Sequence, residues 1–478
     1  MSFWIFVAVA IILYIVYKSL NARTPDGLKD VHTISSFHLF KSAIKKRGGT
    51  DQMYLDFQEY FERDGVVKFF IKGKWICLIS DPIIVKNMLL RPDTFPKLDL
   101  KEYSPIYSRH LGVNVVHSNG DIWKRYRRVC NPAFKTIPVH FFVETGLKLM
   151  NVLERIDNKP IEVMDLMQRF TLDALGKTAF GFDFNNLEDP NNPYVTTYND
   201  VYQGLIHNTF VNIFPLERIP FWLNRAFKKI DKLHNLFDEI IKNKHKFIAA
   251  GKSNGDLLEL MIKACEDQNN ANLTDVELRH NLSIFMFAGH ETTADALSTL
   301  LYLLAVHKDI QQKAREEVIG ILGDSSTPSA EQLKSLKYIN MLIYENLRMY
   351  PSVPIFSLRK LSEDLKCKNN IIPAGTVIGI YPYGIHHSPT LWENPGKFIP
   401  ERFENKNLEN LEFYGFGGGS RMCLGNNFSL LEQRILVCLL LRKYELSLAP
   451  NSIHKDGLKI KRMTEPFPIE LVFKRRNE

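Results

Sequence analysis

Paired cysteines are absent from the sequence, and their absence removes several classes of protein. The six cysteines are scattered, with no CxxC or CxxCH spacing among them. A zinc ribbon, a c-type haem attachment site and a disulfide framework are therefore not indicated. Isolated cysteines of this kind favour a reducing, cytosol-facing environment.

The sequence also lacks a dense basic stripe, internal repeats and low-complexity blocks. A net charge of +8 over 478 residues is small. It does not predict nucleic-acid binding and fits a membrane surface or an acidic protein partner better. Hydrophobic residues make up 45% of the chain and charged residues 24%, which excludes the collagen-like and disordered classes.

A long hydrophobic run stands at the amino terminus. Every residue from Phe3 to Tyr17 is apolar or aromatic, and the run continues to Leu20 with two interruptions. Its length is near the lower limit for a helix that crosses a bilayer. A cleaved signal peptide is the alternative, but no small-residue cleavage site follows, and Lys18 and Arg23 lie on the carboxyl side instead. Basic residues on that side predict that the rest of the chain faces the cytoplasm.

These patterns predict three segments: a transmembrane signal anchor at 3–20, a hinge at 21–30 and a single large domain at 31–478. The domain is expected to be mainly α-helical with small β-sheets. Alternating β-branched and aromatic residues predict a hairpin at 66–79, and a second hairpin is expected at 459–474.

One helix is expected to cross the whole domain. A capping box at 274–277 opens a run without proline to about His307. Such a run of about 30 residues would be roughly 45 Å long. Asp81 and Pro82 are expected to open another helix, as N-cap and first helical residue.

A glycine-rich loop carries Cys423. The residues from Phe416 to Gly425 read FGGGSRMCLG and lead into an apolar-periodic helix. Glycines allow a backbone to approach a flat group closely. Backbone N–H groups and Arg421 are expected to favour the Cys423 thiolate, which is a soft metal ligand. A glycine-rich turn with a buried, inert cysteine is the alternative.

Phe416, Gly419, Arg421, Cys423 and Gly425 fill every specified position of the pattern FxxGxRxCxG. This string resembles the haem-ligand signature of the cytochrome P450 family, of the eukaryotic microsomal type and closest in character to fungal members. The resemblance implies the cytochrome P450 fold and a haem b cofactor, iron protoporphyrin IX. It also implies that Cys423 is the axial ligand of the haem iron, with Phe416 and Arg421 beside the haem.

Two downstream strings resemble the ExxR and PERF elements of the same family. Glu345 and Arg348 lie three residues apart on one expected helix face, where an isolated surface pair contributes about 0.2–0.5 kcal/mol. Arg402 belongs to the string PERF at 400–403. The resemblance implies that these three charged residues form a network that braces the haem loop.

The long helix contains the string FAGHETT at 287–293, which resembles the oxygen-activation motif AGx[DE]T. At 100° per residue, Ala288, Thr292 and Ala296 form a stripe of small residues with Gly289 beside it. A helix with this face can lie close over a flat macrocycle, so Ala288 and Gly289 are expected to line the haem.

The resemblance gives Thr292 and Glu291 catalytic roles. Thr292 would hydrogen-bond dioxygen or an ordered water molecule, and Glu291 would connect that site to solvent protons. A helix-packing face, with Thr292 bonded to its own backbone, is the alternative. His290 is expected to be a polar helix residue and not a ligand.

Trp123 and Arg127 resemble the WxxxR element, whose side chains bond a haem propionate. They lie on one helix face, and a guanidinium group suits a carboxylate. Arg359 stands where the family often supplies another propionate partner. We expect one of two roles for Lys124, Arg125 and Arg128: a docking surface for an acidic electron donor, or ordinary solvated charges.

The resemblance as a whole implies a monooxygenase that inserts one atom of dioxygen into an apolar substrate, such as a steroid, fatty acid, terpene or xenobiotic. Electrons would come from NADPH through a separate NADPH–cytochrome P450 reductase, with cytochrome b5 as a further partner, and the enzyme would be anchored in the endoplasmic reticulum membrane. Segments that contact substrate in the family contain Tyr103, Tyr107, Phe210, Phe214, Phe356 and Phe467.

Three alternatives remain at this point. A haem isomerase or dehydratase of the same fold would work without external electrons, but such relatives often lack the acid–threonine pair. A non-catalytic haem carrier or sensor in the membrane is a second alternative. A membrane-tethered helical interaction protein without a cofactor is the third.

Overall fold

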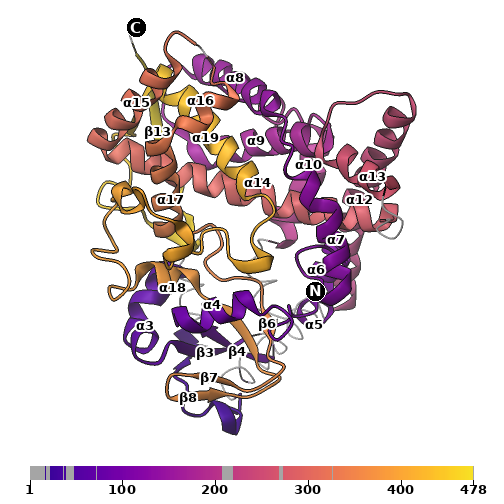
Figure 1. The fold of residues 1–478 in the computed structure, drawn as a ribbon, viewed down its shortest axis with the longest axis vertical. Helices are drawn as coiled ribbons and strands as arrows, with labels where there is room; N and C mark the ends of the chain where they lie inside the picture. The colour runs from indigo at the N-terminus through magenta and orange to yellow at the C-terminus, as the bar shows by residue number, and fades with distance from the viewer. Residues whose placement is uncertain are drawn as a thin grey trace, which may run out of the picture.

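Helices form most of the molecule, and strands form small sheets beside them (Figure 1). No helix of the described part is both long and apolar enough to cross a membrane. The predicted anchor at 3–20 lies outside the described residues except for Tyr17, which is exposed. The computed structural model describes residues 17, 22–35, 37–38, 48–71, 73–206, 219–267, 273–325 and 327–476.

The helices and strands follow one another along the whole chain. The α-helices are α3 (Thr50–Asp64), α4 (Pro82–Leu90), α5 (Leu100–Tyr103), α6 (Pro105–Leu111), α7 (Gly120–Ala133), α8 (Val139–Ile156), α9 (Val163–Leu175), α10 (Pro193–Val201), α12 (Pro220–Ala249), α13 (Leu257–Asp267), α14 (Asp275–Val306), α15 (Lys308–Leu322), α16 (Ala330–Ser335), α17 (Lys337–Met349), α18 (Pro382–His387) and α19 (Asn426–Lys443). Shorter helical turns are η1 (Asp26–Leu28), η2 (Gly176–Phe180), η3 (Tyr202–Ile206), η5 (Pro400–Phe403), η6 (Leu408–Asn410) and η7 (Gly419–Arg421). The strands are β1 (Thr33–Ile34), β2 (Gly48–Gly49), β3 (Val66–Ile71), β4 (Lys74–Ile79), β5 (Ile161–Glu162), β6 (Arg359–Lys360), β7 (Leu365–Cys367), β8 (Asn370–Ile372), β9 (Val377–Ile380), β10 (Tyr444–Leu448), β11 (Ile460–Met463), β12 (Glu465–Pro466) and β13 (Glu470–Arg475).

The largest sheet has the strand order β1-β3-β4-β9-β6. Strands β3 and β4 form the predicted hairpin, with Val66 opposite Ile79. The chain then enters α4 as expected, because the Asp81 carboxylate accepts the backbone N–H of Ile84 at 3.0 Å. Strand β6, which carries Arg359, pairs with β9 and forms one edge of this sheet.

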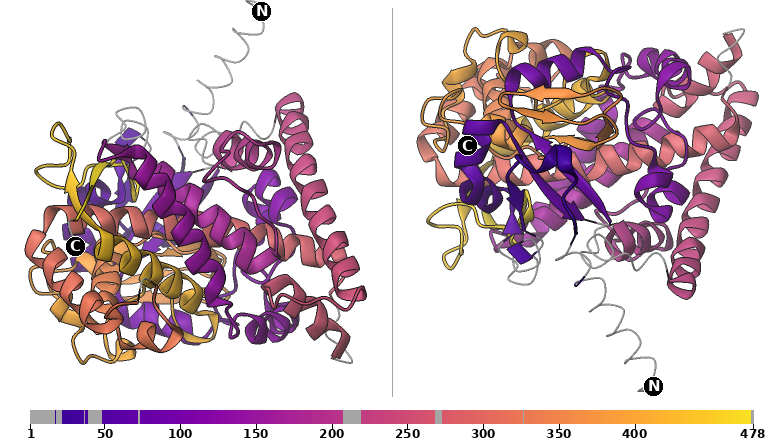
Figure 2. Two further views of the ribbon diagram at one scale, coloured as in Figure 1. Left: turned by 90° about the horizontal axis from the view of Figure 1, so that it is seen from above. Right: turned by 90° about the horizontal axis from the view of Figure 1, so that it is seen from below.

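Helix α14 crosses the molecule, and helices from both the amino-terminal and the carboxy-terminal parts of the chain pack on it (Figure 2). The predicted capping box is confirmed: Thr274 Oγ1 accepts the N–H of Glu277, and the Glu277 carboxylate accepts the N–H of Thr274. The helix spans 32 residues and is buried on nearly every face. Helices α9, α12, α17 and α19 surround it.

The prediction of a closing hairpin at 459–474 was wrong in its pairing. Strand β11 pairs with the very short β12 and with β2, whereas β13 pairs with β10 and β5. The strand-forming residues were identified correctly, but the partners of β13 lie far away in sequence. A local alternation of residue types cannot specify such partners.

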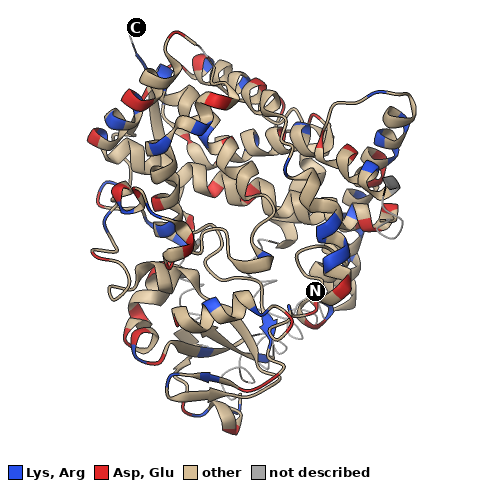
Figure 3. Ribbon diagram, in the orientation of Figure 1, with Lys and Arg blue, Asp and Glu red and all other residues tan. Residues whose placement is uncertain are grey.

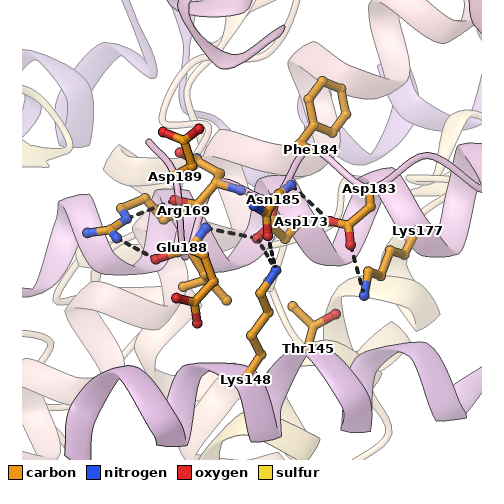
Figure 4. A network of polar contacts seen from close by, with 12 residues as sticks. Thr145, Lys148, Arg169, Asp173, Lys177, Asp183, Phe184, Asn185, Glu188 and Asp189 are labelled. Atoms are coloured by element: carbon orange, nitrogen blue, oxygen red, sulfur yellow. Dashed lines mark hydrogen bonds and ion pairs between the residues drawn. The ribbon is translucent and has the colours of Figure 1, made fainter. Parts of the chain in front are cut away.

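The segment after α9 is attached to that helix by polar contacts (Figure 4). Asp173 is fully buried and accepts the backbone N–H groups of Asn186 and Leu187 at 2.7 and 2.9 Å. Burial raises the pKa of Asp173 above its usual value. Lys148 from α8 approaches the same carboxylate at 3.9 Å. These contacts hold α8 and α9 in register beside α14.

Candidate active site

The loop around Cys423 depends on two glycines with positive φ. Gly417 has φ 75° and Gly419 has φ 60°, a region that favours glycine. A Cβ atom on Gly419 would stand 2.3 Å from the carbonyl oxygen of Leu89 in α4. The loop closes where the N–H of Cys423 donates to the carbonyl of Phe416 at 3.0 Å. The glycine pattern thus fixes a tight turn packed directly against a helix backbone.

Cys423 is the one exposed cysteine among the six in the chain. The protein atoms around it nevertheless desolvate the thiol, and this burial raises its pKa above the usual value. The N–H of Gly425 and the charge of Arg127 act in the opposite direction. A thiol that is both surrounded by protein and accessible is the situation of a side chain that faces a binding site.

The expectation that Arg421 favours the Cys423 thiolate was wrong. Arg421 turns away, donating to the carbonyl of Ser118 at 2.8 Å and to Asn119 Oδ1 at 3.2 Å. Its guanidinium lies 4.0 Å over the ring of Trp123. Sequence proximity was misleading because the Arg421 side chain is held by Ser118, Asn119 and Trp123, which come from a distant part of the chain.

Trp123 and Arg127 both contact the cysteine loop, whereas the haem-propionate contacts that the WxxxR resemblance implies for them stay a prediction. Trp123 carries the stacked guanidinium of Arg421, and Arg127 donates to the carbonyl of Met422 at 3.1 Å. Both side chains come from the same face of α7. Helix α7 carries several basic positions, which are coloured blue on the ribbon in Figure 3. One of them, Arg125, pairs with Glu277 at the start of α14.

Several cations converge near Arg421 with little negative charge to balance them. Arg359 is buried, donates one N–H to the carbonyl of Phe95, and has an Nε group without a partner among the described residues. Burial lowers the pKa of Arg359 to about 10. Burial and repulsion from Arg359 and Arg127 lower the pKa of Arg421 to about 10.

Lys97 belongs to the same group of cations and the imidazole of His117 lies beside it; sequence reasoning missed both. Burial and the charges of Arg359 and Arg421 hold the pKa of Lys97 well below its usual value. Burial, Lys97 and Arg421 lower the pKa of His117 to about 3. No motif marks either residue. The fold places them here: Lys97 pairs with Arg359 in an isolated bridge, and its backbone bonds to the side chain of Asn119, two residues after His117.

Helix α14 presents a small accessible face in the middle of its buried length. Ala288 is exposed and Thr292 is half-buried, whereas the residues at 281–286 are buried. The Thr292 hydroxyl donates to the carbonyl of Ala288 at 2.6 Å, so the backbone bond foreseen as the alternative is present. The hydroxyl oxygen can still accept a hydrogen bond from a ligand at this face.

Glu291 and His290 lie on the other side of the helix. Glu291 is buried, and its charge raises the pKa values of Tyr198 and Tyr202 further above normal than burial alone. His290 Nδ1 accepts the Tyr198 hydroxyl at 3.1 Å, and its Nε2–H donates to the carbonyl of Gln168 at 2.9 Å. His290 is therefore a structural polar residue, as expected.

The network of Glu345, Arg348 and Arg402 is formed as predicted. Glu345 and Arg348 are fully buried and make two hydrogen bonds of 2.7 and 2.9 Å. Arg402 donates to Glu345 at 3.2 Å. Arg348 also donates to the carbonyl of His386, whose ring accepts the N–H of Tyr414 at 2.9 Å. The network therefore reaches the start of the cysteine loop.

A haem group fits the donors that these elements bring together. Its iron prefers a thiolate, and Cys423 offers an accessible sulfur. Its two propionates are anionic, and the cations around Arg421 include buried N–H groups that have no partner in the described part of the chain. Arginine pairs with carboxylates through strong, geometrically matched hydrogen bonds. The repulsion within this group of cations is what two carboxylates would relieve.

Some of the aromatic residues expected to contact substrate lie near α14. The ring of Tyr107 lies 6.5 Å from that of Phe287 and 5.7 Å from that of Tyr103. Phe356 is half-buried, and a Cβ atom on Gly417 would stand 4.0 Å from its ring edge. Phe467 is half-buried as well. The predicted contacts Phe210 and Phe214 lie outside the described residues.

Comparison with known proteins settles the family. The family model for cytochrome P450 matches residues 34–471. The chain belongs to the cytochrome P450 family. A human relative, cytochrome P450 4X1, is 30% identical over 397 residues, which are 78% of this chain and 76% of the relative. This P450 is accordingly a thiolate-haem monooxygenase, an oxidoreductase that acts on an organic substrate.

Other relatives and a solved structure agree with this assignment. The 11-oxo-beta-amyrin 30-oxidase of Glycyrrhiza uralensis is 30% identical, covering 79% of this P450 and 74% of the relative. Cytochrome P450 3A25 of Mus musculus is 26% identical, covering 92% and 90%. The crystal structure of the cytochrome P450DA heme domain has a TM-score of 0.80 at 22% identity, covering 94% of this chain and 98% of that one. The mainly α P450 fold with small sheets is confirmed.

Proposed function

We propose that Cys423 is the axial ligand of a bound haem b and that the cations around Arg421 hold the haem propionates. The observation that carries this assignment is the pairing of one accessible cysteine with an unbalanced group of buried cations. Trp123, Arg127 and Arg359 would complete the propionate site. Phe416 would pack beside the thiolate, because its carbonyl already accepts the N–H of Cys423.

Helix α14 would form the opposite wall of the site. Ala288 and Gly289 have side chains small enough for a macrocycle to approach the helix closely. The haem supplies dioxygen binding and O–O cleavage, which an axial thiolate favours. Thr292 would hold a proton donor or ordered water at the oxygen site, and Glu291 would pass protons to it from the interior.

The substrate would be an apolar molecule such as a steroid, fatty acid, terpene or xenobiotic. Tyr107, Phe287 and Phe356 supply an aromatic lining near α14, and such linings bind apolar ligands. Electrons would come from NADPH through a membrane-bound reductase, with cytochrome b5 as a further partner. The exposed basic residues Lys124 and Arg128 on α7 would meet an acidic donor.

The chain would be held at the endoplasmic reticulum membrane by a signal anchor at 3–20. A hinge at 21–30 would connect this anchor to the haem domain at 31–478, which would face the cytoplasm. The apolar run and the basic residues after it support this topology.

A substitution of the proposed ligand tests the assignment. We expect Cys423→Ser to abolish the thiolate-type spectrum of the reduced, carbon monoxide-bound protein, because a hydroxyl cannot replace a thiolate as a soft donor. Cys130→Ser is the matched control, since Cys130 is buried in α7. A thiolate-type spectrum that survives in Cys423→Ser would contradict the assignment. Turnover without NADPH or a reductase would instead favour an isomerase or dehydratase.

A further inference from the structure

The loop that follows α17 places a serine hydroxyl against the backbone of α14. Ser352 is half-buried, and its Oγ donates to the carbonyl of Thr292 at 2.7 Å. The hydroxyl of Thr292 in turn donates to the carbonyl of Ala288 at 2.6 Å. None of the roles given above uses Ser352.

A second side chain makes the same kind of contact one turn further along α14. Asn346 of α17 is fully buried, and its Nδ2 donates to the carbonyl of Ala296 at 2.8 Å. Ala288, Thr292 and Ala296 are four residues apart, so they lie along one stripe of the helix. The carbonyl of each accepts a hydrogen bond from a side chain. Two of these three bonds come from outside α14.

The segment that carries Ser352 has a restrained backbone. Pro351 and Pro354 stand on either side of it, and the proline ring fixes φ at both positions. Further along, the N–H of Phe356 donates to the carbonyl of Ile380 in β9 at 2.9 Å. Because little conformational freedom remains to be lost in this segment, the bond from Ser352 constrains α14 more than it constrains the loop.

A donor from outside alters the turn of helix that it contacts. In an α-helix the carbonyl of residue i accepts the N–H of residue i+4, and its two lone pairs allow it to accept a second bond. Side chains that insert into this pattern are a cause of local bending in helices. The Thr292 side chain is bonded to the carbonyl one turn before it, so its hydroxyl follows the geometry of the same turn.

We propose that Ser352 is a positioning residue for Thr292. Its hydroxyl fixes the Thr292 carbonyl while the Asn346 amide fixes the next carbonyl of the stripe, and the turn between Ala288 and Ala296 therefore keeps one arrangement. Ser352 does this from the backbone side and needs no contact with dioxygen or substrate. The inference rests on the proposed function, which places the Thr292 hydroxyl at the oxygen site.

The first experiment measures backbone hydrogen exchange in the full-length protein and needs no turnover. In Ser352→Ala the amides of α14 at 288–296 should exchange roughly two- to tenfold faster, because a hydrogen bond that holds this turn is lost. Ser352→Thr keeps a hydroxyl and should restore slow exchange. Unchanged exchange in Ser352→Ala overturns the proposal.

Ser325→Ala is the matched control for this experiment. It also removes a serine hydroxyl that donates to a backbone carbonyl, that of Thr327 at 2.6 Å, but in the loop between α15 and α16. Exchange at 288–296 should stay as in the wild type. Faster exchange there in Ser325→Ala would show that any lost surface bond has this effect, which would overturn the specific role of Ser352.

The second experiment uses carbon monoxide as a probe of the oxygen site in the reduced holoprotein. The infrared C–O stretch responds to polar groups near the bound gas, so Thr292→Ala should shift it. Ser352→Ala should shift or broaden the band, and Ser352→Thr should restore it. In a protein that already carries Thr292→Ala, adding Ser352→Ala should change nothing further, because the hydroxyl to be positioned is gone. An unchanged band in Ser352→Ala, or additive effects of the two substitutions, would overturn the positioning role even if exchange in α14 rises.

The two experiments distinguish this inference from the proposed function. A C–O band that does not respond to Thr292→Ala, or a thiolate-type spectrum retained in Cys423→Ser, would mark failure of the proposed site, and the positioning role would fall with it. Expected responses in those two variants but none in Ser352→Ala would mark failure of the positioning role alone. Should Ser352→Ala fail to fold, Ser352→Cys keeps the side chain's shape with a weaker donor and should cause the same changes to a smaller extent.

Discussion

At the scale of single residues, the site is built from positive charges that the protein does not neutralise by itself. Burial lowers the pKa values of Lys97, Arg359 and Arg421. The charge of Arg359 lowers the pKa values of Lys97 and Arg421 further, and the charge of Arg421 acts in the same way on Lys97. Among the described residues Asp93 is the acid whose charge acts on Arg421 in the opposite direction. Such an arrangement is stable when a bound anion pairs with the cations and offsets their repulsion, as two haem propionates would here.

Lys97→Met should therefore have effects of opposite sign with and without haem. In the haem-free protein the free energy of unfolding should rise, because a repelling charge is removed. In the loaded protein haem should dissociate faster by roughly tenfold or more, since a hydrogen bond to a charged group contributes about 1.5–3 kcal/mol. Chemical denaturation and haem transfer to an acceptor protein measure the two effects. Lys101→Met, at an exposed position of α5, should change neither; a Lys97→Met protein that loses stability without haem would contradict the argument.

Residues within a contiguous string could be predicted from the sequence, and residues joined only by the fold could not. The glycine-rich turn that carries Cys423 could be predicted because its pattern is local. Lys97 and His117 are far from Arg421 along the chain and carry no pattern of their own. Arg421 itself was assigned to the thiolate because the two are neighbours in sequence, whereas the structure turns its side chain to Ser118 and Trp123.

At the scale of elements, the cysteine loop and α4 are in direct backbone contact through Gly419. Gly419→Ala should destabilise the protein by at least about 1–2 kcal/mol, the cost of a left-handed backbone for a residue with a Cβ, because the Cβ also meets Leu89. Haem retention should fall with it. Gly320→Ala is the control: no described atom lies within 4 Å of a Cβ at this position in α15, so it should stabilise the helix by about 0.5–1 kcal/mol. Thermal unfolding of both variants, followed by haem absorbance, measures these effects. A Gly419→Ala protein as stable as the wild type would contradict the close contact with Leu89.

The network on α17 connects that helix to the cysteine loop, and its members differ in burial. Arg348 is fully buried, whereas Arg402 is 11% exposed. Arg348→Lys should be the more damaging change, because lysine keeps the charge but lacks the planar fork that bonds both carboxyl oxygens of Glu345 and the carbonyl of His386. Arg402→Lys should cost less, since Glu345 keeps its two bonds to Arg348. Yields of haem-loaded protein and denaturant midpoints rank the two; equal losses would show that the network acts as a single unit.

Helices were easier to predict than sheets because their signals, like the sequence motifs, lie close together along the chain. Strand pairings, like the group of cations around Arg421, join residues that are far apart in sequence. The bounds of α4 and α14 follow from capping residues that lie next to them in sequence. The hairpin of β3 and β4 is also local. The pairing of β13 with β10 and β5 is not, and the alternation of residues in β13 is compatible with any partner.

At the scale of the whole molecule, buried neutral histidines make the free energy of unfolding depend on pH. His110 lies in α6 against α12 and α14, and His387 lies at the end of α18 stacked on Tyr383 at 3.9 Å. Burial lowers the pKa of each to about 3. In the unfolded chain a histidine titrates near its ordinary value of about 6.5.

Between these two pKa values the unfolded chain takes up a proton that the folded protein does not. Acidification from about pH 6.5 towards pH 3 should therefore reduce the free energy of unfolding, by up to about 1.4 kcal/mol per pH unit for each such histidine. His387→Gln removes one titrating group, so the free energy of unfolding should change less with pH, by about 1.4 kcal/mol per pH unit. The glutamine amide can still donate to the Tyr383 carbonyl that His387 Nδ1 contacts at 2.9 Å. His140→Gln, at an exposed position of α8, should leave the slope unchanged. Denaturant unfolding at a series of pH values measures the slopes, and identical slopes for wild type and His387→Gln would show that His387 is not held neutral by burial.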